Sequence, residues 1–227
     1  MIFKQLFDEE SCTYTYLIAS GPGREAIIID PVLANIKAYT ALLRDLKIKL
    51  AFTLDTHIHA DHITASGLLK QELDCQYIMG EYAKVDCVDL KVRDSDIINF
   101  DGFKLKALFT PGHTSDSFSF IFNQSVFTGD TLLINATGRT DFQNGDSEAQ
   151  YDSLFNKLLK LPSDTVVYPA HDYNGKTSST IGCEIENNPR LQVDSVSEYV
   201  ELMSNLNLSL PRYIDVAVPA NQRGGFI

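Results

Sequence analysis

Short apolar runs alternate with amphipathic segments along the chain, which is typical of an α/β protein. Runs rich in β-branched and aromatic residues predict strands at residues 12–18 and 26–29, with a turn at residues 21–23 between them. Apolar positions at helical spacing predict four helical segments. These segments cover about residues 34–46, a stretch that starts near Thr64, a stretch from Tyr151 to Leu159 that Pro162 ends, and a stretch that starts at Ser195.

The inward faces of the first and last predicted helices can be assigned from the same spacing. The last helix starts with Ser195 three positions before Glu198, which is the spacing of a capping box. The residues expected to face the core are Ile36, Tyr39, Leu43 and Leu46 in the first helix and Val196, Val200, Met203 and Leu206 in the last.

Other apolar runs each end just before a histidine or an aspartate. The pairs are residues 50–54 before His57, 105–109 before His113, 125–128 before Asp130 and 166–168 before His171. If these strands lie side by side, their carboxyl ends bring the polar residues to one edge of a sheet sandwich, on loops that a rigid scaffold holds.

The chain has only five histidines, and three of them fall between residues 57 and 62. A lone His-x-His pair is as often a surface loop as a metal ligand. Here further carboxylates and imidazoles follow at strand ends, and these groups suit iron, zinc or manganese. The candidate ligands are His57, His59, Asp61, His62, His113, Asp130 and His171.

Composition narrows the class of protein. The chain has 227 residues and a formal net charge of −11, so one domain spanning residues 1–227 is expected, and nucleic acid and anionic membranes are unfavourable partners. No apolar stretch long enough to span a membrane and no secretory signal is found. The four cysteines form no C-x-x-C pair, which favours a reducing compartment and leaves disulfides as an alternative. No dinucleotide, phosphate-loop or serine-hydrolase motif is present.

The string Thr-His-Ile-His-Ala-Asp-His at residues 56–62 resembles the H-x-H-x-D-H motif of the metallo-β-lactamase superfamily. Residues 112–114, 128–130 and 170–172 match its later ligand positions in the same order. The resemblance implies an α/β fold, an αββα sandwich of two mixed β-sheets flanked by helices. In two-metal members of the superfamily, His57, His59 and His113 would hold one ion, Asp61, His62 and His171 would hold the second, and Asp130 would bridge them.

Within this superfamily the chain is most similar to the persulfide dioxygenases, also called sulfur dioxygenases, of the ethylmalonic encephalopathy type. The similarity runs from about residue 10 to 225 and is carried by the strings at residues 138–143, 168–173, 187–190 and 214–221. It implies one Fe(II) per subunit, held by His57, His113 and Asp130. His59, Asp61, His62 and His171 would then orient these ligands and relay protons, or hold a second metal.

The implied reaction oxidises glutathione persulfide with O2 and water to sulfite and glutathione, as part of sulfide catabolism. Two histidines and one carboxylate leave open positions on iron for dioxygen and a sulfur ligand. Glutathione is anionic, so an acidic protein needs local positive charge to bind it. Lys176, Arg190, Arg212 and Arg223 are the candidates.

Three further residues lie near the predicted ligands in sequence. Arg139 is expected to form an ion pair with Asp141 or a neighbouring acid close to the site, and the alternative is that it positions the site loop or a substrate carboxylate. Tyr173 is expected near the site, as a hydrogen-bond donor or as loop packing. Asp172 is expected to fix the tautomer of a ligand imidazole.

The main alternative is a glyoxalase II-like hydroxyacylglutathione hydrolase, which uses two metals and a bridging hydroxide. Only residues 172–227 follow the last candidate ligand, whereas that branch adds a larger helical region, and this favours the dioxygenase. A β-lactamase or lactonase does not account for the Arg-Thr-Asp-Phe-Gln string, and a non-catalytic protein would be expected to have lost ligands. The family suggests a homodimer located in the bacterial cytoplasm or the mitochondrial matrix.

Overall fold

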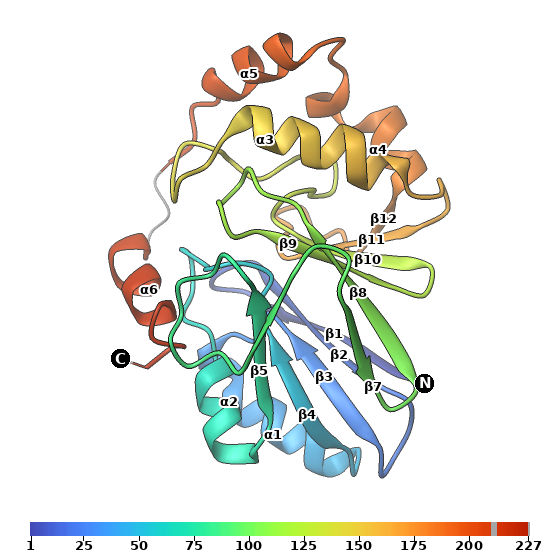
Figure 1. Ribbon diagram of the computed structural model, residues 1–227, viewed down its shortest axis with the longest axis vertical. Helices are drawn as coiled ribbons and strands as arrows, with labels where there is room; N and C mark the ends of the chain where they lie inside the picture. The colour runs from blue at the N-terminus through green and yellow to red at the C-terminus, as the bar shows by residue number, and fades with distance from the viewer. Residues whose placement is uncertain (210–212, 227) are drawn as a thin grey trace. The chain divides into compact units, whose positions relative to one another are not determined.

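The computed structural model describes residues 1–209 and 213–226. The chain groups into two compact units, the first formed by residues 1–92, 98–104 and 210–227 and the second by residues 93–97 and 105–209. Each unit is built around a six-stranded sheet (Figure 1). The expectation of one domain over residues 1–227 stays a prediction.

The first sheet has the order β1-β2-β3-β4-β5-β6. Its first three strands pair antiparallel and the remaining ones parallel, so the sheet is mixed. The strands are β1 (Ile2–Asp8), β2 (Thr13–Ala19), β3 (Glu25–Ile29), β4 (Lys49–Leu54), β5 (Gln76–Gly80) and β6 (Leu90–Val92). Because β4 runs parallel to β3, the ends of both strands point to the same edge, where the loop at residues 55–64 begins.

Helices α1 (Ile36–Asp45) and α2 (Ser66–Leu73) pack on this sheet, and α6 (Ile214–Asn221) belongs to the same unit (Figure 1). Tyr39 and Leu43 of α1 are buried against β2, β3 and β4. Ile36 and Leu46 pack at the margin of this core. The predicted helix and its inward face are therefore confirmed.

The second sheet has the order β12-β11-β10-β9-β8-β7, and most of its residues belong to the second unit. Its strands are β7 (Ile97–Phe100), β8 (Phe103–Phe109), β9 (Phe118–Phe122), β10 (Ser125–Gly129), β11 (Val166–Pro169) and β12 (Ser179–Thr180). β9 is antiparallel to both β8 and β10, and β10 is parallel to β11. Consequently β8, β10 and β11 run in one direction and end at the same edge of the sheet.

The helices of the second unit cover a core of residues from β10 and β11. They are α3 (Ser147–Asp152), α4 (Ile181–Asn187) and α5 (Val196–Ser204), with a π-helical turn at Ser153–Lys157 and 3-10 turns at Leu158–Lys160 and Pro189–Leu191; a further 3-10 turn, Leu33–Asn35, lies in the first unit. Among the described residues, no helix is both long and apolar enough to cross a bilayer.

The predicted strands and the helical segment at Tyr151–Leu159 are present to within a few residues, and two details of their arrangement differ from a simple reading of the pattern. β4 belongs to a different sheet from β8, β10 and β11, and β9 separates β8 from β10, so the four strands are not all neighbours. The segment from Tyr151 to Leu159 is not one regular α-helix, although its apolar residues pack into the core as predicted.

The inward face of α5 also needs correction. Ser195 caps the helix as expected, since its hydroxyl accepts the N–H of Glu198. Val196, however, is 39% exposed, whereas Tyr199 is fully buried. Val196 is the first helical residue, so the stripe that meets the core starts one turn later and runs through Tyr199 and Met203, which are four positions apart.

Candidate metal centre

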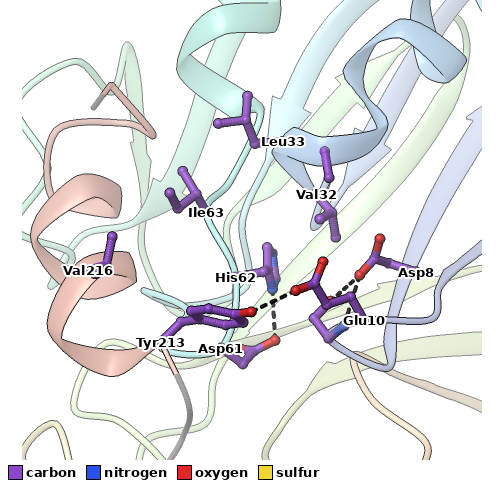
Figure 2. A pocket seen from close by; sticks show the side chains of 11 residues that line it. Asp8, Glu10, Val32, Leu33, Asp61, His62, Ile63, Tyr213 and Val216 are labelled. Carbon is purple, nitrogen blue, oxygen red and sulfur yellow. Dashed lines mark hydrogen bonds and ion pairs between the residues drawn. The ribbon is translucent and has the colours of Figure 1, made fainter.

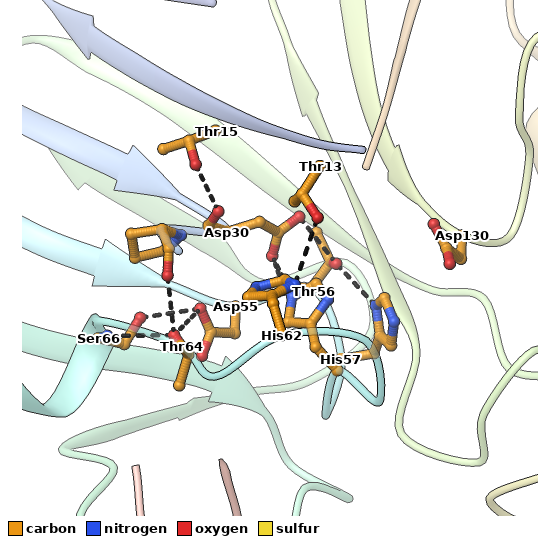
Figure 3. A network of polar contacts seen from close by, with 12 residues as sticks. Thr13, Thr15, Asp30, Asp55, Thr56, His57, His62, Thr64, Ser66 and Asp130 are labelled. Atoms are coloured by element: carbon orange, nitrogen blue, oxygen red, sulfur yellow. Dashed lines mark hydrogen bonds and ion pairs between the residues drawn. The ribbon is translucent and has the colours of Figure 1, made fainter. Parts of the chain in front are cut away.

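Asp30, at the end of β3, organises the polar residues of the first unit (Figure 3). Its carboxylate accepts the N–H of Thr56 at 2.7 Å and the Thr56 hydroxyl at 3.0 Å. His59 Nε2 lies 3.1 Å from the same carboxylate. Asp30 is 1% exposed and has a positive φ of 50°, which an aspartate tolerates better than most residues. A buried carboxylate is stable when donors surround it in this way.

Sequence reasoning missed Asp30. The available signal was its position directly after four apolar residues and before Pro31, at the end of a buried strand. Carboxylates in that position are as often turn residues as site residues, so the pattern alone does not mark it.

Asp30 determines which ring nitrogen His57 presents. The single proton of the Thr56 hydroxyl goes to Asp30, so the Thr56 oxygen acts as an acceptor towards His57 Nδ1, which lies 3.0 Å away. His57 therefore carries its proton on Nδ1, and Nε2 has the lone pair that can bind a metal. His57 is 1% exposed, so its ring is held inside the unit.

His59 is held by the opposite nitrogen. Burial lowers its pKa, but the charge of Asp30 and the hydrogen bond to it, with smaller contributions from Asp61 and Asp55, raise that pKa to about 9. The rings of His57, His59 and His62 follow one another at centroid distances of 4.2 and 4.3 Å. The three histidines of the motif thus form one continuous group.

Asp61 and His62 form a pair at the end of this group. His62 Nδ1 lies 2.9 Å from Asp61 Oδ2 and 3.3 Å from the Thr13 hydroxyl, which itself donates to Asp61 at 3.2 Å. His62 Nε2 is buried and has no hydrogen-bond partner among residues 1–209 and 213–226. His59, Asp61 and His62 each offer one ligand atom within 4.8 Å of the others. This donor set fits a metal ion.

The Asp61–His62 pair also lines a cavity of about 360 Å³ within the first unit (Figure 2). Val32, Leu33 and Ile63 give the cavity an apolar wall. Tyr213, at the start of α6, and Glu10 also line this cavity, and the Tyr213 hydroxyl donates a hydrogen bond to Glu10 at 2.6 Å.

Asp55 holds the loop at residues 55–64, called the motif loop here, through hydrogen bonds to neighbouring elements. The sequence did not single Asp55 out. It is 2% exposed and accepts hydrogen bonds from the hydroxyl groups of Tyr77, Ser66 and Thr64 at 2.6, 2.8 and 3.0 Å. Burial raises the pKa of this carboxyl group, and the nearby charge of Asp30 raises it further. Asp55 thereby ties the loop to the start of α2 through Ser66 (Figure 3). Through Tyr77 it also ties the loop to β5.

In the second unit, β8, β10 and β11 deliver His113, Asp130 and His171 to one edge of the sheet. His113 Nδ1 lies 2.7 Å from the main-chain carbonyl of Arg139. A carbonyl only accepts, so His113 is protonated on Nδ1 and presents Nε2. That Nε2 is 3.6 Å from Asp130 Oδ2, which is too long for a hydrogen bond and suits two ligands of one metal ion.

Asp130 is fixed by His171. His171 Nδ1 donates to Asp130 Oδ1 at 2.6 Å, and His171 is 1% exposed. This contact occupies one carboxylate oxygen and leaves Oδ2 on the side of His113. Within this unit the donors are thus an imidazole Nε2 and a carboxylate oxygen, each oriented by another group.

A glycine brings the carbonyl of Arg139 to His113. The Gly138 N–H donates to the Asp130 carbonyl at 2.8 Å, and a Cβ at Gly138 would lie 2.2 Å from that oxygen and 2.8 Å from His113 Nδ1. Gln150, fully buried, donates to the Gly138 carbonyl at 3.1 Å and accepts the Tyr199 hydroxyl at 2.8 Å. Gln150 and Tyr199 support the site, and no sequence motif pointed to them.

The side chain of Arg139 contacts neighbouring residues of its own loop. It forms the predicted ion pair with Asp141, through two contacts of 2.6 and 2.7 Å, and lies over the ring of Phe142. Its contribution to the candidate centre is therefore the main-chain carbonyl that orients His113.

The remaining predicted residues lie at the margin of the site. Asp172 accepts the N–H groups of Asn174 and Lys176 at 2.8 and 2.7 Å, so it fixes the turn after His171 rather than an imidazole. The Tyr173 ring stacks on His171 with an interplanar angle of 4°. Arg190 donates to the Thr137 carbonyl, and burial lowers the pKa of Arg190.

Of the other cations proposed for glutathione, Lys176 is exposed and Arg223 donates to the carbonyl of Phe226. Arg212 lies outside the described residues.

The Gly138→Ala substitution tests how the second unit positions His113. The added methyl group cannot fit without moving the Asp130 carbonyl or the His113 ring, so metal affinity should fall about 10- to 100-fold, as is typical when the support of a ligand is disturbed. The measurement is metal binding in competition with a chromophoric chelator. Gly21→Ala is the control, because nothing lies within 4 Å of a Cβ at that position. Equal affinities for both variants would contradict this role of Gly138.

Comparison with known proteins agrees with this geometry. A family model of the metallo-β-lactamase superfamily matches residues 12–171. The chain is 44% identical over 228 residues to the Homo sapiens protein named persulfide dioxygenase ETHE1, mitochondrial, a match that covers 99% of this chain and 89% of that protein. The crystal structure of ETHE1 from Myxococcus xanthus matches with a TM-score of 0.96 and 45% identity, covering 99% of this chain and 100% of that one.

A hydrolase from Dictyostelium discoideum, named hydroxyacylglutathione hydrolase, is more distant. It is 32% identical over 187 residues, covering 77% of this chain and 68% of that protein. The predicted fold class is confirmed, with two mixed sheets flanked by helices. The chain is an enzyme that belongs to the metallo-β-lactamase superfamily and, within it, to the persulfide dioxygenase family.

Proposed function

We propose that this enzyme is a glutathione-dependent persulfide dioxygenase with one Fe(II) per subunit. In the proposal, glutathione persulfide, O2 and water react to give sulfite and glutathione, and His57, His113 and Asp130 are the iron ligands. The observation that carries the proposal is the 44% identity over 99% of the chain to a protein named persulfide dioxygenase.

The donor chemistry supports iron at these residues. His57 and His113 are both held by Nδ1, through the Thr56 oxygen and the Arg139 carbonyl, and both keep Nε2 for a metal. Asp130 keeps Oδ2 while Oδ1 is bonded to His171. Two imidazoles and one carboxylate are the donor set of non-haem Fe(II) oxygenases, and when bound such an ion supplies open positions and electron transfer for dioxygen chemistry.

The other histidines and carboxylates have tasks that do not require metal ligation. His171 holds the Asp130 carboxylate in place through its Nδ1–H. The Asp61–His62 pair can hold or release a proton between Asp61 Oδ2 and His62 Nδ1, and the reaction needs such a carrier because it consumes water. His59 stays attached to Asp30. Asp172 orders the loop that carries Lys176, the exposed cation that we propose for glutathione binding.

The expected homodimer and compartment form part of the same proposal. The similar proteins of Homo sapiens, Mus musculus and Bos taurus are named as mitochondrial, which supports the mitochondrial matrix, and the bacterial cytoplasm is the corresponding place in a bacterium. The cysteines are all free thiols, as a reducing compartment requires.

The alternative is a two-metal hydroxyacylglutathione hydrolase. The donor set of His59, Asp61 and His62, with the buried Nε2 of His62, is the observation that favours it. Its relatives are less similar to this chain than the persulfide dioxygenases are.

Dioxygen uptake tests the proposal directly. Iron-loaded enzyme should consume O2 on addition of glutathione persulfide and release one sulfite for each O2 consumed, because both oxygen atoms enter the terminal sulfur and water supplies the third. S-lactoylglutathione is the parallel substrate. Thioester hydrolysis without O2 uptake would contradict the dioxygenase and support the two-metal hydrolase.

Iron retention in two variants tests the proposed ligands. Asp130→Ala should abolish iron binding because it removes a ligand, while His171→Ala should keep part of the iron because it removes only the group that orients Asp130. The measurement is iron per subunit after gel filtration. Retention in Asp130→Ala together with complete loss in His171→Ala would overturn the assignment.

A further inference from the structure

The Pro-Ala-Asn string at residues 219–221 ends α6, and its asparagine reaches the metal motif. Asn221 is 2% exposed. Its side-chain amide donates to the carbonyls of His59 and His62 at 2.9 and 2.8 Å and accepts the N–H of Thr64 at 2.9 Å. One side chain thus satisfies three main-chain groups of the segment from His59 to Thr64.

The segment after Asn221 reinforces this contact. Gly225 has a positive φ of 86°, and a Cβ there would lie 2.0 Å from the carbonyl of Thr64. Gly224 accepts the N–H of Gly67 at 3.0 Å, at the start of α2. The main chain of residues 221–225 therefore packs directly against the motif loop, at a distance that only glycine permits at Gly225.

The other end of α6 is attached to the same region. Tyr213 precedes the helix and donates to Glu10, on the loop between β1 and β2 (Figure 2). β2 begins with Thr13, whose hydroxyl contacts both Asp61 and His62. The C-terminal end of α6 thus contacts His62 directly through Asn221. Its N-terminal end contacts, through Tyr213, the loop that precedes Thr13, and Thr13 contacts Asp61 and His62.

His57 has a separate support. Its Nδ1 is held by Thr56, and Thr56 is held by Asp30 at the end of β3. The hydrogen bonds of Asn221 fall on main-chain groups of His59, His62 and Thr64 and on none of Asp30, Thr56 and His57. The His59 ring, by contrast, is bonded to Asp30. The motif loop is thus held at its beginning by β3 and at its end by α6.

We propose that Asn221 is a positioning residue that sets the Asp61–His62 pair for turnover without contributing to iron binding. This inference rests on the proposed function, because its activity readout is O2 uptake by the dioxygenase. Loss of the Asn221 amide leaves two buried carbonyls and one buried N–H without their partner. The main chain of residues 62–64 then shifts, while the His59 ring stays bonded to Asp30 and His57 stays attached to Asp30 through Thr56.

The test compares Asn221→Ala with Asn205→Ala in the iron-loaded enzyme. Asn205 is exposed and its amide also donates to a main-chain carbonyl, that of Glu201, at 2.8 Å. Asn221→Ala should accelerate hydrogen exchange of the Thr64 amide about tenfold and lower kcat for O2 uptake about 10- to 100-fold. Iron per subunit should equal that of the wild type. Asn205→Ala should match the wild type in all three measurements.

Gly225→Ala gives an independent perturbation if Asn221→Ala does not fold. It should show the same combination of faster Thr64 exchange, lower kcat and retained iron. Gly102→Ala is its control, because Gly102 has a similar φ of 81° and nothing within 4 Å of a Cβ. The backbone strain is then the same, and only the contact with Thr64 differs.

Three results would overturn the inference. These are unchanged Thr64 exchange, faster exchange with unchanged kcat, and loss of iron in proportion to loss of activity, since the last would mean that Asn221 supports the iron ligands themselves. A wild-type enzyme that takes up no O2 would refute the proposed function instead. Thr64 exchange in the variants would still show whether Asn221 positions the loop.

Discussion

The buried carboxylate of Asp30 is the constraint on which the candidate ligands of the first unit depend. A charge in this position is costly unless donors surround it, and the Thr56 amide, the Thr56 hydroxyl and His59 supply them. The same bonds turn the Thr56 oxygen into an acceptor for His57 and so select its tautomer. The same contacts thus stabilise the charge of Asp30 and orient His57 as a metal ligand.

The second unit reaches the same result with different groups. A main-chain carbonyl takes the place of Thr56 and holds His113 by Nδ1, and Gly138 provides the space that this approach needs. His171 orients Asp130 in turn. Each proposed iron ligand is therefore fixed by a hydrogen-bond partner, which reduces the reorganisation that metal binding requires.

The sequence predicted the parts of this architecture that depend on local periodicity. The strands before His57, His113, Asp130 and His171 and the apolar face of α1 follow from spacing alone. Contacts between distant segments do not leave such a pattern. Asp30 was missed because a carboxylate before a proline is also a common turn residue, and Val196 was misplaced because, as the first helical residue, it lies before the buried stripe begins. Gln150 and Asn221 act through main-chain groups, which no motif records.

The identity of the iron ligands is the central claim. Pulsed electron–nuclear double resonance of the ferrous–nitrosyl enzyme tests it most directly. With nitrogen-15 introduced only into histidine, we expect coupling to the Nε2 atoms of two histidines, and both couplings should persist in His171→Ala, which keeps part of its iron. Coupling to three or more histidines, or a spin-coupled pair of irons, would contradict a single iron held by His57, His113 and Asp130.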